Sequence, residues 1–174
     1  MKKYTWGNIT INKEEFISVP NKWSIIKIKN PDSFEIQSSG IDEFEDKKEY
    51  LSTESISGTE LVSVQDSITF KERPARANLQ PKQKTVYFAK MKDTFKVILP
   101  DERFCEKYIL STGFAGLHTK GIDSNFVKYV VSSDFFTCKK DGFCMGTTQE
   151  AINNRWIREI SLPLPPKEEQ IIIS

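Results

Sequence analysis

The sequence predicts an α+β domain with a twisted, mostly antiparallel sheet and two or more helices. Short β-rich runs fill the chain between residues 41 and 99, and two patterns with helical spacing follow between residues 124 and 160. Runs of strands followed by helices are typical of this class. The 174 residues, of which 38% are hydrophobic, suffice for one domain with its own core.

The first strands are expected near the N-terminus. Ile9 and Ile11 form a short alternating run that predicts an edge strand. Pro20 and Asn21 predict a turn, and a short apolar segment of extended or helical form follows it. The residues of this segment that can enter the core are Trp23, Ile25, Ile26 and Ile28.

Further strands are predicted from apolar and β-branched runs in the middle of the chain. One run precedes Gly58, and another occupies residues 84–90. In the segment TFKVILP, Phe95, Val97 and Leu99 alternate with other residues and predict a half-buried strand. The apolar residues of the first run are Tyr50, Leu51 and Ile56, and the short runs LVSV and SITF follow them.

One helix is expected over residues 124–138, where apolar residues repeat at helical spacing. Asp123 or Ser124 can cap its first turn. Gly142 can stop it, and two lysines before this glycine suit the negative end of a helix. The apolar stripe consists of Phe126, Val127, Val130, Val131 and Phe135, and the lysines are Lys139 and Lys140.

A second helix is expected to begin at Thr147. The motif TTQE places Thr147 and Glu150 three residues apart, which is the spacing of a capping box. These two residues are therefore assigned to structure, whereas Thr148 and Gln149 could meet a phosphate or an adenine edge. The buried stripe of this helix is expected to contain Ile152, Trp156, Ile157 and Ile160.

The last fifteen residues, ISLPLPPKEEQIIIS, combine an extended element with the beginning of a helix. Three prolines fix residues 160–165 in an extended form. Pro166 suits the first helical position, and two glutamates follow it in the first turn. The sequence therefore divides into a domain at 1–165 and a helix start at 166–174. The residues of this helix that are expected to contact a partner are Ile171, Ile172 and Ile173.

The charge distribution is uneven, although the net charge is only +1. Between Lys71 and Lys96, eight lysines and arginines meet two acidic residues, which gives a local charge of +6. One basic face is enough to hold DNA, yet a basic run is more often a solvated surface. Pro74 and Pro81 keep this stretch out of a regular helix, so its polar residues should lie on a loop before the strand at 84–90. These loop residues are Arg73, Arg76, Asn78, Gln80 and Gln83.

Catalytic, metal-binding and cofactor-binding patterns are absent from the sequence. His118 is the only histidine, and it is expected on an exposed loop that can touch DNA. The three cysteines have neither disulfide nor zinc spacing, and no phosphate-binding or dinucleotide-binding glycine motif occurs. No apolar run has the length of a membrane span and no signal peptide begins the sequence, so we expect a cytoplasmic protein.

Several phrases of the chain resemble one known family. LPLPPKEEQ and the preceding GTTQEAI carry the strongest likeness, and VPNKW, YLSTESISG and ARANLQP carry a moderate one. Together they resemble a single target recognition domain of a type I restriction–modification DNA specificity subunit, followed by the start of its spacer helix. The chain departs from the family where Gln83 and Lys84 replace a usual Gly-Asp pair, and where Lys90 replaces an arginine.

This resemblance implies sequence-specific recognition of double-stranded DNA. Partner subunits would carry out adenine methylation and cleavage, so the chain itself would hold no catalytic residue, no metal and no cofactor. The implied partners are modification methyltransferase subunits, which carry S-adenosylmethionine, and a restriction subunit. With one recognition domain, the chain is expected to be a fragment or a half-length subunit that dimerises.

The resemblance also implies roles for the polar residues. Lysines and arginines would contact phosphates, while a few side chains would read base edges in the major groove. The predicted DNA-binding residues are Arg73, Arg76, Asn78, Gln80, Lys82, Lys84, Lys90, Lys92, His118, Lys120, Thr148 and Gln149.

Three alternatives stay open. The chain could be the recognition domain of a fused restriction–methylation enzyme, which would share the fold and the DNA role. The LPLPP phrase could be a polyproline II ligand of a protein-interaction module. Burial separates this ligand from a connector between the domain and its spacer helix. A ligand must be exposed, whereas a connector packs Leu162 and Leu164 on its own domain. A hydrolase is the third alternative, which a His118→Ala substitution would test.

Overall fold

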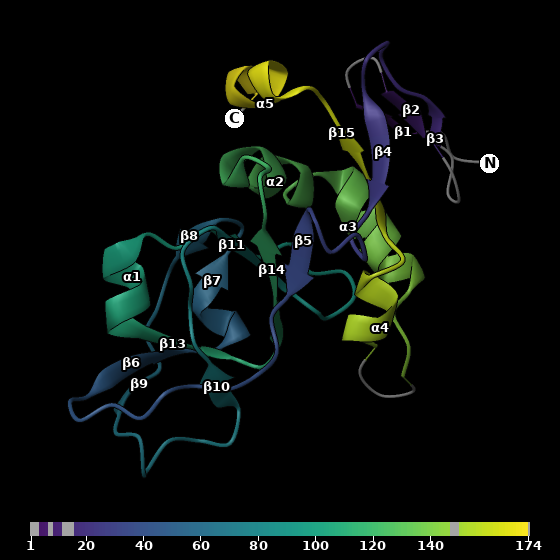
Figure 1. Ribbon diagram of the computed structural model, residues 1–174. Helices are drawn as coiled ribbons and strands as arrows, with labels where there is room; N and C mark the ends of the chain where they lie inside the picture. The colour runs from purple at the N-terminus through teal and green to yellow at the C-terminus, as the bar shows by residue number, and fades with distance from the viewer. Residues whose placement is uncertain (1–3, 7–8, 12–15, 147–149, 174) are drawn as a thin grey trace.

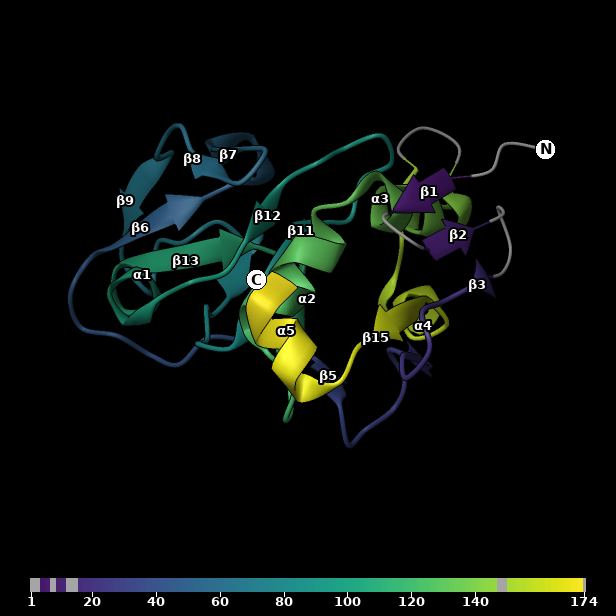
Figure 2. The ribbon, with the colours of Figure 1, turned by 90° about the horizontal axis from the view of Figure 1, so that it is seen from above.

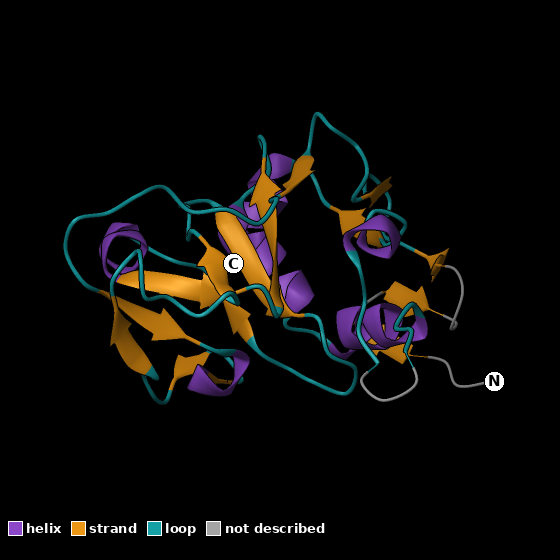
Figure 3. Cartoon of the chain, turned by 90° about the horizontal axis from the view of Figure 1, so that it is seen from below, coloured by secondary structure: helices purple, strands orange, loops and turns teal. Residues whose placement is uncertain are grey.

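The computed structural model describes residues 4–6, 9–11, 16–146 and 150–173 (Figure 1). Short strands connected by long loops make up most of the chain (Figure 3). The helices are α1 (Glu102–Lys107), α2 (Ser124–Val131), α3 (Asp134–Gly142), α4 (Asn154–Ile157) and α5 (Lys167–Ile173), with a 3-10 turn η1 (Thr53–Ser55). The strands are β1 (Tyr4–Trp6), β2 (Ile9–Ile11), β3 (Phe16–Ser18), β4 (Ser24–Lys27), β5 (Phe34–Ile36), β6 (Lys48–Leu51), β7 (Ile56–Ser57), β8 (Glu60–Leu61), β9 (Asp66–Ile68), β10 (Ala77–Leu79), β11 (Thr85–Ala89), β12 (Val97–Ile98), β13 (Tyr108–Ser111), β14 (Phe114–Thr119) and β15 (Ser161–Leu164).

Two four-stranded sheets are the largest sheets of the described chain. The first has the order β12-β11-β14-β5, and the second has the order β10-β13-β6-β9. Among the described strands, only β6 and β13 pair in parallel. The remaining described strands form a β1-β2-β3 sheet and the pairs β4-β15 and β7-β8. The predicted α+β class with mostly antiparallel pairing is confirmed. The strands form several small sheets in place of one, because they are short and register shifts interrupt their pairing.

Strand β11 lies at the centre of the core, since all five of its residues are buried. On one face, Val86 and Phe88 belong to the main core cluster, which contains the apolar side of α2. On the other face, Tyr87 and Ala89 belong to the second core cluster, where they pack with residues of β6, β10, β13 and β14. The loop that follows β11 therefore begins at a strand that is packed on both faces. The residues that α2 buries are Phe126, Val127, Val130 and Val131.

The single helix predicted over residues 124–138 is wrong, because the chain forms α2 and α3 instead. Asp123 does cap α2, and its carboxylate accepts a hydrogen bond from Phe126 N at 2.9 Å. Ser133 begins α3: its hydroxyl accepts from Phe136 N at 3.3 Å and donates to Val130 O at 2.6 Å. A serine that bonds to the backbone in this way competes with a continuous helix. The end of α3 at Gly142 agrees with the prediction.

The second predicted helix begins later in the chain than Thr147. Residues 147–149 lie outside the described part of the chain, and Glu150 belongs to an irregular segment. The helix of this region is α4, which Asn153 caps by accepting two backbone hydrogen bonds at 3.0 and 3.2 Å. Glu150 is not part of a helix, and its Oε2 pairs with Lys92. The expected apolar stripe is nevertheless inside, with Trp156 partly buried and with Ile152, Ile157 and Ile160 buried.

Two apolar residues that the sequence placed in the core are exposed. Ile25 is 48% exposed, because one face of the narrow β4–β15 pair is turned to solvent. Phe95 is 46% exposed, and the strand predicted around it shortens to β12. The Phe95 ring lies beside the turn at Gly58, where a Cβ atom would be 3.6 Å from it. Gly58 has a φ of +59°, so this turn also needs glycine for its backbone.

The proline-containing segment is part of the domain. As predicted it is extended, and β15 pairs antiparallel with β4. Pro163 can occupy this strand because β15 has a neighbour on one edge only among the described strands. The segment buries Leu162, Pro163 and Pro165 and packs Leu164 against the main core cluster.

The predicted helix after Pro166 is present as α5, and it is bound to the domain (Figure 2). Trp23 Nε1 donates to Glu169 Oε2 at 2.7 Å. The buried side chain of Gln170 accepts from Asp123 N at 2.9 Å and donates to Pro165 O at 3.0 Å. The start of α5 is thereby fixed to the first turn of α2 and to the chain before β4. The helix then lies over α2, and Ile173 packs against the core (Figure 2).

Candidate nucleic-acid interface

The basic residues predicted to bind DNA fall at the two ends of the β11–β14 strand pair. Lys84 precedes β11, and its carbonyl accepts from Thr119 N at 2.9 Å. Lys90 follows β11, and its N donates to Gly113 O at 2.9 Å. A strand of five residues is about 16 Å long. The predicted residues therefore form two separate clusters and not one patch.

The exit cluster is formed by Arg76 and Lys90 at the end of β11. Arg76 is exposed, and its carbonyl accepts from Thr112 N at 2.9 Å, which brings it to the same β13–β14 turn that Lys90 contacts. Lys90 is half-buried; burial lowers the pKa of its ammonium group, and the charge of Arg76 lowers this pKa further. Among the described residues, neither side chain has a carboxylate partner. Two neighbouring cations without a counter-charge are suited to an anion such as a phosphate.

The entry cluster contains Lys82, Lys84, His118 and Lys120. His118 lies in β14 opposite Thr85, with 3.0 Å between its Nδ1 and Thr85 Oγ1, so its predicted loop position is wrong. His118 is half-buried near the end of β14, although Phe114 and Gly116, which alternation places on the same face, are buried. Lys82 and Lys84 are exposed, whereas the ammonium group of Lys120 forms an ion pair with Glu35.

Glu35 moderates the charge of the entry cluster. Its carboxylate lies 3.0 Å from Lys120 Nζ. The hydrogen bond and charge of Lys120 lower the pKa of Glu35, and the charges of His118 and Lys82 act in the same direction. The carboxylate therefore stays ionised and partly cancels the local positive charge. The exit cluster, in contrast, has no carboxylate partner among the described residues, while Lys82 and Lys84 remain the unpaired cations of the entry cluster.

Three other predicted residues are engaged in structure. The Arg73 guanidinium lies 4.0 Å from the centre of the Phe70 ring and donates to Phe70 O. Asn78 is half-buried within β10, which corrects its predicted loop position. Gln80 donates through Nε2 to Cys105 O at 3.2 Å. These contacts restrict the side chains of Arg73 and Gln80, and all three residues keep some exposed surface.

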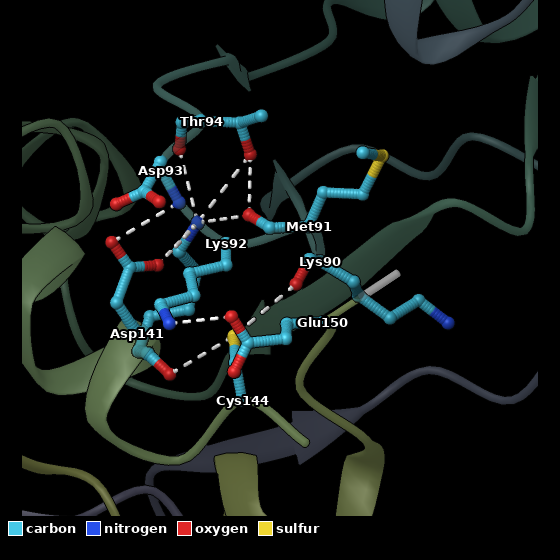
Figure 4. A network of polar contacts seen from close by, with 9 residues as sticks. Lys90, Met91, Lys92, Asp93, Thr94, Asp141, Cys144 and Glu150 are labelled. Carbon is cyan, nitrogen blue, oxygen red and sulfur yellow. Dashed lines mark hydrogen bonds and ion pairs between the residues drawn. The ribbon is translucent and has the colours of Figure 1, made fainter. Parts of the chain in front are cut away.

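Lys92 and Glu150 join two segments that carry predicted DNA-binding residues (Figure 4). Their side chains form an ion pair at 2.5 Å, and Lys92 N donates to Glu150 O at 2.9 Å. The side-chain hydrogen bond to Glu150 and the charge of its carboxylate raise the pKa of Lys92. Thr148 and Gln149 lie outside the described residues, but Glu150, which follows them directly, is held next to the loop after β11.

A buried lysine holds the same loop from the other side. Lys140 of α3 is 2% exposed, and its Nζ donates to Met91 O at 2.5 Å and to Thr94 O at 3.0 Å. Its charge is compensated by Asp141, whose Oδ1 lies 3.2 Å away. Asp141 Oδ2 in turn accepts from Asp93 N at 3.2 Å. Asp93 has a φ of +55°, so the turn is one that the surrounding contacts must hold in place.

This role of Lys140 was not predicted from the sequence. There Lys139 and Lys140 are equivalent cations at a helix end, and helical position alone gives no reason to bury one of them. The ion pair of Lys92 with Glu150 was also missed, because the two residues are 58 positions apart. Groups of His, Cys, Asp and Glu that could hold a metal ion do not occur among the described residues. In that same part of the chain, no helix is long and apolar enough to span a membrane.

Comparison with known proteins gives one family and several similar structures. The family described as "Type I restriction modification DNA specificity domain" matches residues 20–174. The HsdS subunit from Thermoanaerobacter tengcongensis is similar with a TM-score of 0.72 and 21% identity, over 88% of this chain and 40% of that chain. A chain from a study of type I R-M complex assembly and conformational transition has a TM-score of 0.69 and 21% identity, over 90% of this chain and 41% of that chain.

A third structure, the S subunit of a type I restriction-modification system from M. genitalium, has a TM-score of 0.57 and 17% identity, over 90% of this chain and 38% of that chain. No curated protein sequence matches. At these identities the likeness concerns the fold. The chain spans about two fifths of the length of the structures that it matches.

Proposed function

Because this chain belongs to the family of type I restriction modification DNA specificity domains, we propose that it recognises one half of a bipartite site in double-stranded DNA. It would direct adenine methylation and cleavage, both carried out by partner subunits. The observation that carries this proposal is the exit cluster, in which Arg76 and Lys90 share one turn and have no carboxylate partner in the described chain. Such cations fix a protein on phosphates, and an exposed arginine can also read a guanine edge.

The rigid surroundings of the exit cluster support this role. Lys90 directly follows the fully buried strand β11, and the next residues are held by Lys140 and Glu150. A side chain that reads a base must be positioned by a framework that does not move, and β11 provides it. The entry cluster would contribute phosphate contacts through Lys82 and Lys84, which are exposed.

We propose that the partners are modification methyltransferase subunits, which carry S-adenosylmethionine, and a restriction subunit. Helix α5 would be the beginning of a spacer helix, with the domain at 1–165 and the helix at 166–174. Ile171 and Ile172 are 70% and 82% exposed, whereas Ile173 packs partly against the core. The surface offered to a spacer helix or a second copy of the chain would therefore be Ile171 and Ile172.

Burial argues against the reading of LPLPP as a polyproline ligand. Leu162, Pro163 and Pro165 are buried in the domain, and the strand pairs with β4 along its whole length. A ligand for an aromatic groove needs its prolines exposed. The recognition domain of a fused enzyme remains compatible with the fold, and it would bind DNA in the same way.

Binding to duplex DNA is expected to weaken steeply with salt. Contacts with about three phosphates give a slope of about −2.7 when log affinity is plotted against log salt concentration. The assay is a titration of labelled duplex at several salt concentrations, with the methyltransferase subunit present. The Lys90→Gln change should reduce the slope by about 0.9, whereas Lys47→Gln, which changes an exposed lysine outside both clusters, should leave it unchanged. Absent or salt-independent binding would contradict the proposed function.

The Arg76→Ala change is expected to weaken binding to the cognate duplex by about 1–3 kcal/mol and to relax specificity at one base pair. Arg76 is exposed, and only its carbonyl takes part in the fold, so the melting temperature should change little. Arg158→Ala, which removes another exposed arginine, is the matched control. Equal loss for both variants, or unfolding of the Arg76 variant, would show that Arg76 does not read DNA.

A further inference from the structure

A groove of about 430 Å³ lies between α1, α2 and the β7–β8 pair. This volume is in the range of sites that bind ligands or anchor side chains. None of the residues predicted to bind DNA lines it. Its lining includes Ile56, Leu61, Ile98, Asp101, Arg103 and Lys128.

The floor of the groove is apolar and continues onto an exposed strip. Ile56 and Ile98 form the floor and belong to the second core cluster, so the floor is rigid. Leu61 at the edge is 40% exposed, and Val62 and Val64, which follow it, are 58% and 42% exposed. Neighbouring exposed apolar side chains next to a hollow are typical of a surface that contacts another protein.

The rim of the groove is basic. Lys107 is paired with Glu49 at 3.2 Å, but Arg103 and Lys128 have no ion pair or side-chain hydrogen bond within the described chain. The acidic residue of the lining is Asp101, whose Oδ1 caps α1 by accepting from Phe104 N at 2.8 Å. Its carboxylate keeps its charge, so the lysines and the arginine of the rim outnumber the acidic residue by three to one. Arg103 and Lys128 thus stand beside an apolar floor without a direct ion pair.

We propose that this groove docks a segment of a partner protein in which a large apolar side chain stands between carboxylates. The apolar side chain would enter the groove, and the carboxylates would meet Arg103 and Lys128. Nucleic acid fits this surface less well, because interfaces with DNA are polar and strongly charged, whereas here the floor and the adjoining strip are apolar. Strand β8 pairs only with β7 among the described strands, so the backbone of an extended segment could also pair with its other edge.

The test uses random twelve-residue peptides displayed on phage and selected on the immobilised chain. Sequences with Leu or Phe between acidic residues should be enriched. Peptides made from them should bind about 10-fold or more weakly to the Arg103→Glu, Lys128→Glu double variant, since each reversal places like charges together. A Lys47→Glu, Lys71→Glu double variant makes the same change in net charge outside the groove and should bind like the unchanged chain.

A second variant tests the apolar contact alone. Leu61→Gln removes an exposed apolar side chain from the edge of the groove and should also weaken binding by about 10-fold, with little effect on the melting temperature. No enrichment, or enriched peptides that bind all variants equally, would overturn the proposal. A loss of binding to random-sequence duplex DNA in the Arg103→Glu, Lys128→Glu variant would overturn it too, because the groove would then be a nucleic-acid surface.

Discussion

The Lys140→Met change is expected to lower the free energy of unfolding by about 3–5 kcal/mol, which is the range for breaking a buried ion pair by removing one partner. Methionine keeps the apolar stem but removes the ammonium group. The carbonyls of Met91 and Thr94 would lose their donor, and Asp141 Oδ1, which makes no hydrogen bond to any described residue, would keep a charge without compensation. Urea unfolding followed by circular dichroism measures the change.

Two companion variants separate the contributions to this loss. Lys71→Met changes an exposed lysine and should alter the free energy of unfolding by less than about 0.5 kcal/mol. Asp141→Asn in the Lys140→Met background should recover part of the loss, because it removes the uncompensated charge and keeps an acceptor for Asp93 N. If Lys140→Met unfolds at the same urea concentration as Lys71→Met, the loop after β11 is not held by this lysine.

Leu162→Ala is expected to lower the free energy of unfolding by about 2–5 kcal/mol, as usual for a buried leucine truncated to alanine. Leu162 is 3% exposed and belongs to the main core cluster with Ile28 and Ile160. The change leaves a cavity between the β4–β15 pair and the core. Chemical denaturation gives the value, and Ile172→Ala, at an 82% exposed position, provides a control with an expected change below about 0.5 kcal/mol.

The same experiment tests whether the LPLPP segment packs on the domain or is exposed. A small effect at Leu162, equal to that at Ile172, would mean that the segment does not pack on the domain in solution. The phrase LPLPP would then be available as a ligand. A large effect agrees with a connector that is built into the fold.

Elements with local signals were predictable from the sequence. Asp123 caps α2, and the extended segment and helix at the end of the chain are β15 and α5. Proline geometry and helix capping depend on neighbouring residues alone, so the local sequence is enough to predict these elements. The start of the second predicted helix was wrong for the opposite reason: Glu150 lies in an irregular segment, and its carboxylate pairs with a lysine 58 residues away.

The candidate site was predictable in composition but not in arrangement. The basic stretch does supply the exit cluster, yet Arg73 stacks on Phe70 and Lys92 is neutralised by Glu150. Which cations remain without a counter-charge depends on carboxylates that only the fold brings near. His118 illustrates the same limit, since its strand position follows from pairing with Thr85.

The pairing of β4 with β15 also determines when the domain can be completed during synthesis. Ser24 and Leu164 face each other although they are 140 positions apart. At about 5–20 residues per second, a ribosome needs about 7–28 s to produce β15 after β4 has been made. During that interval β4 has an unpaired edge, and the apolar Ile26 and Ile28 lack the neighbours that later cover them. The nascent chain would therefore pass through a stage in which its first segment is prone to aggregate and is suited to binding by a chaperone.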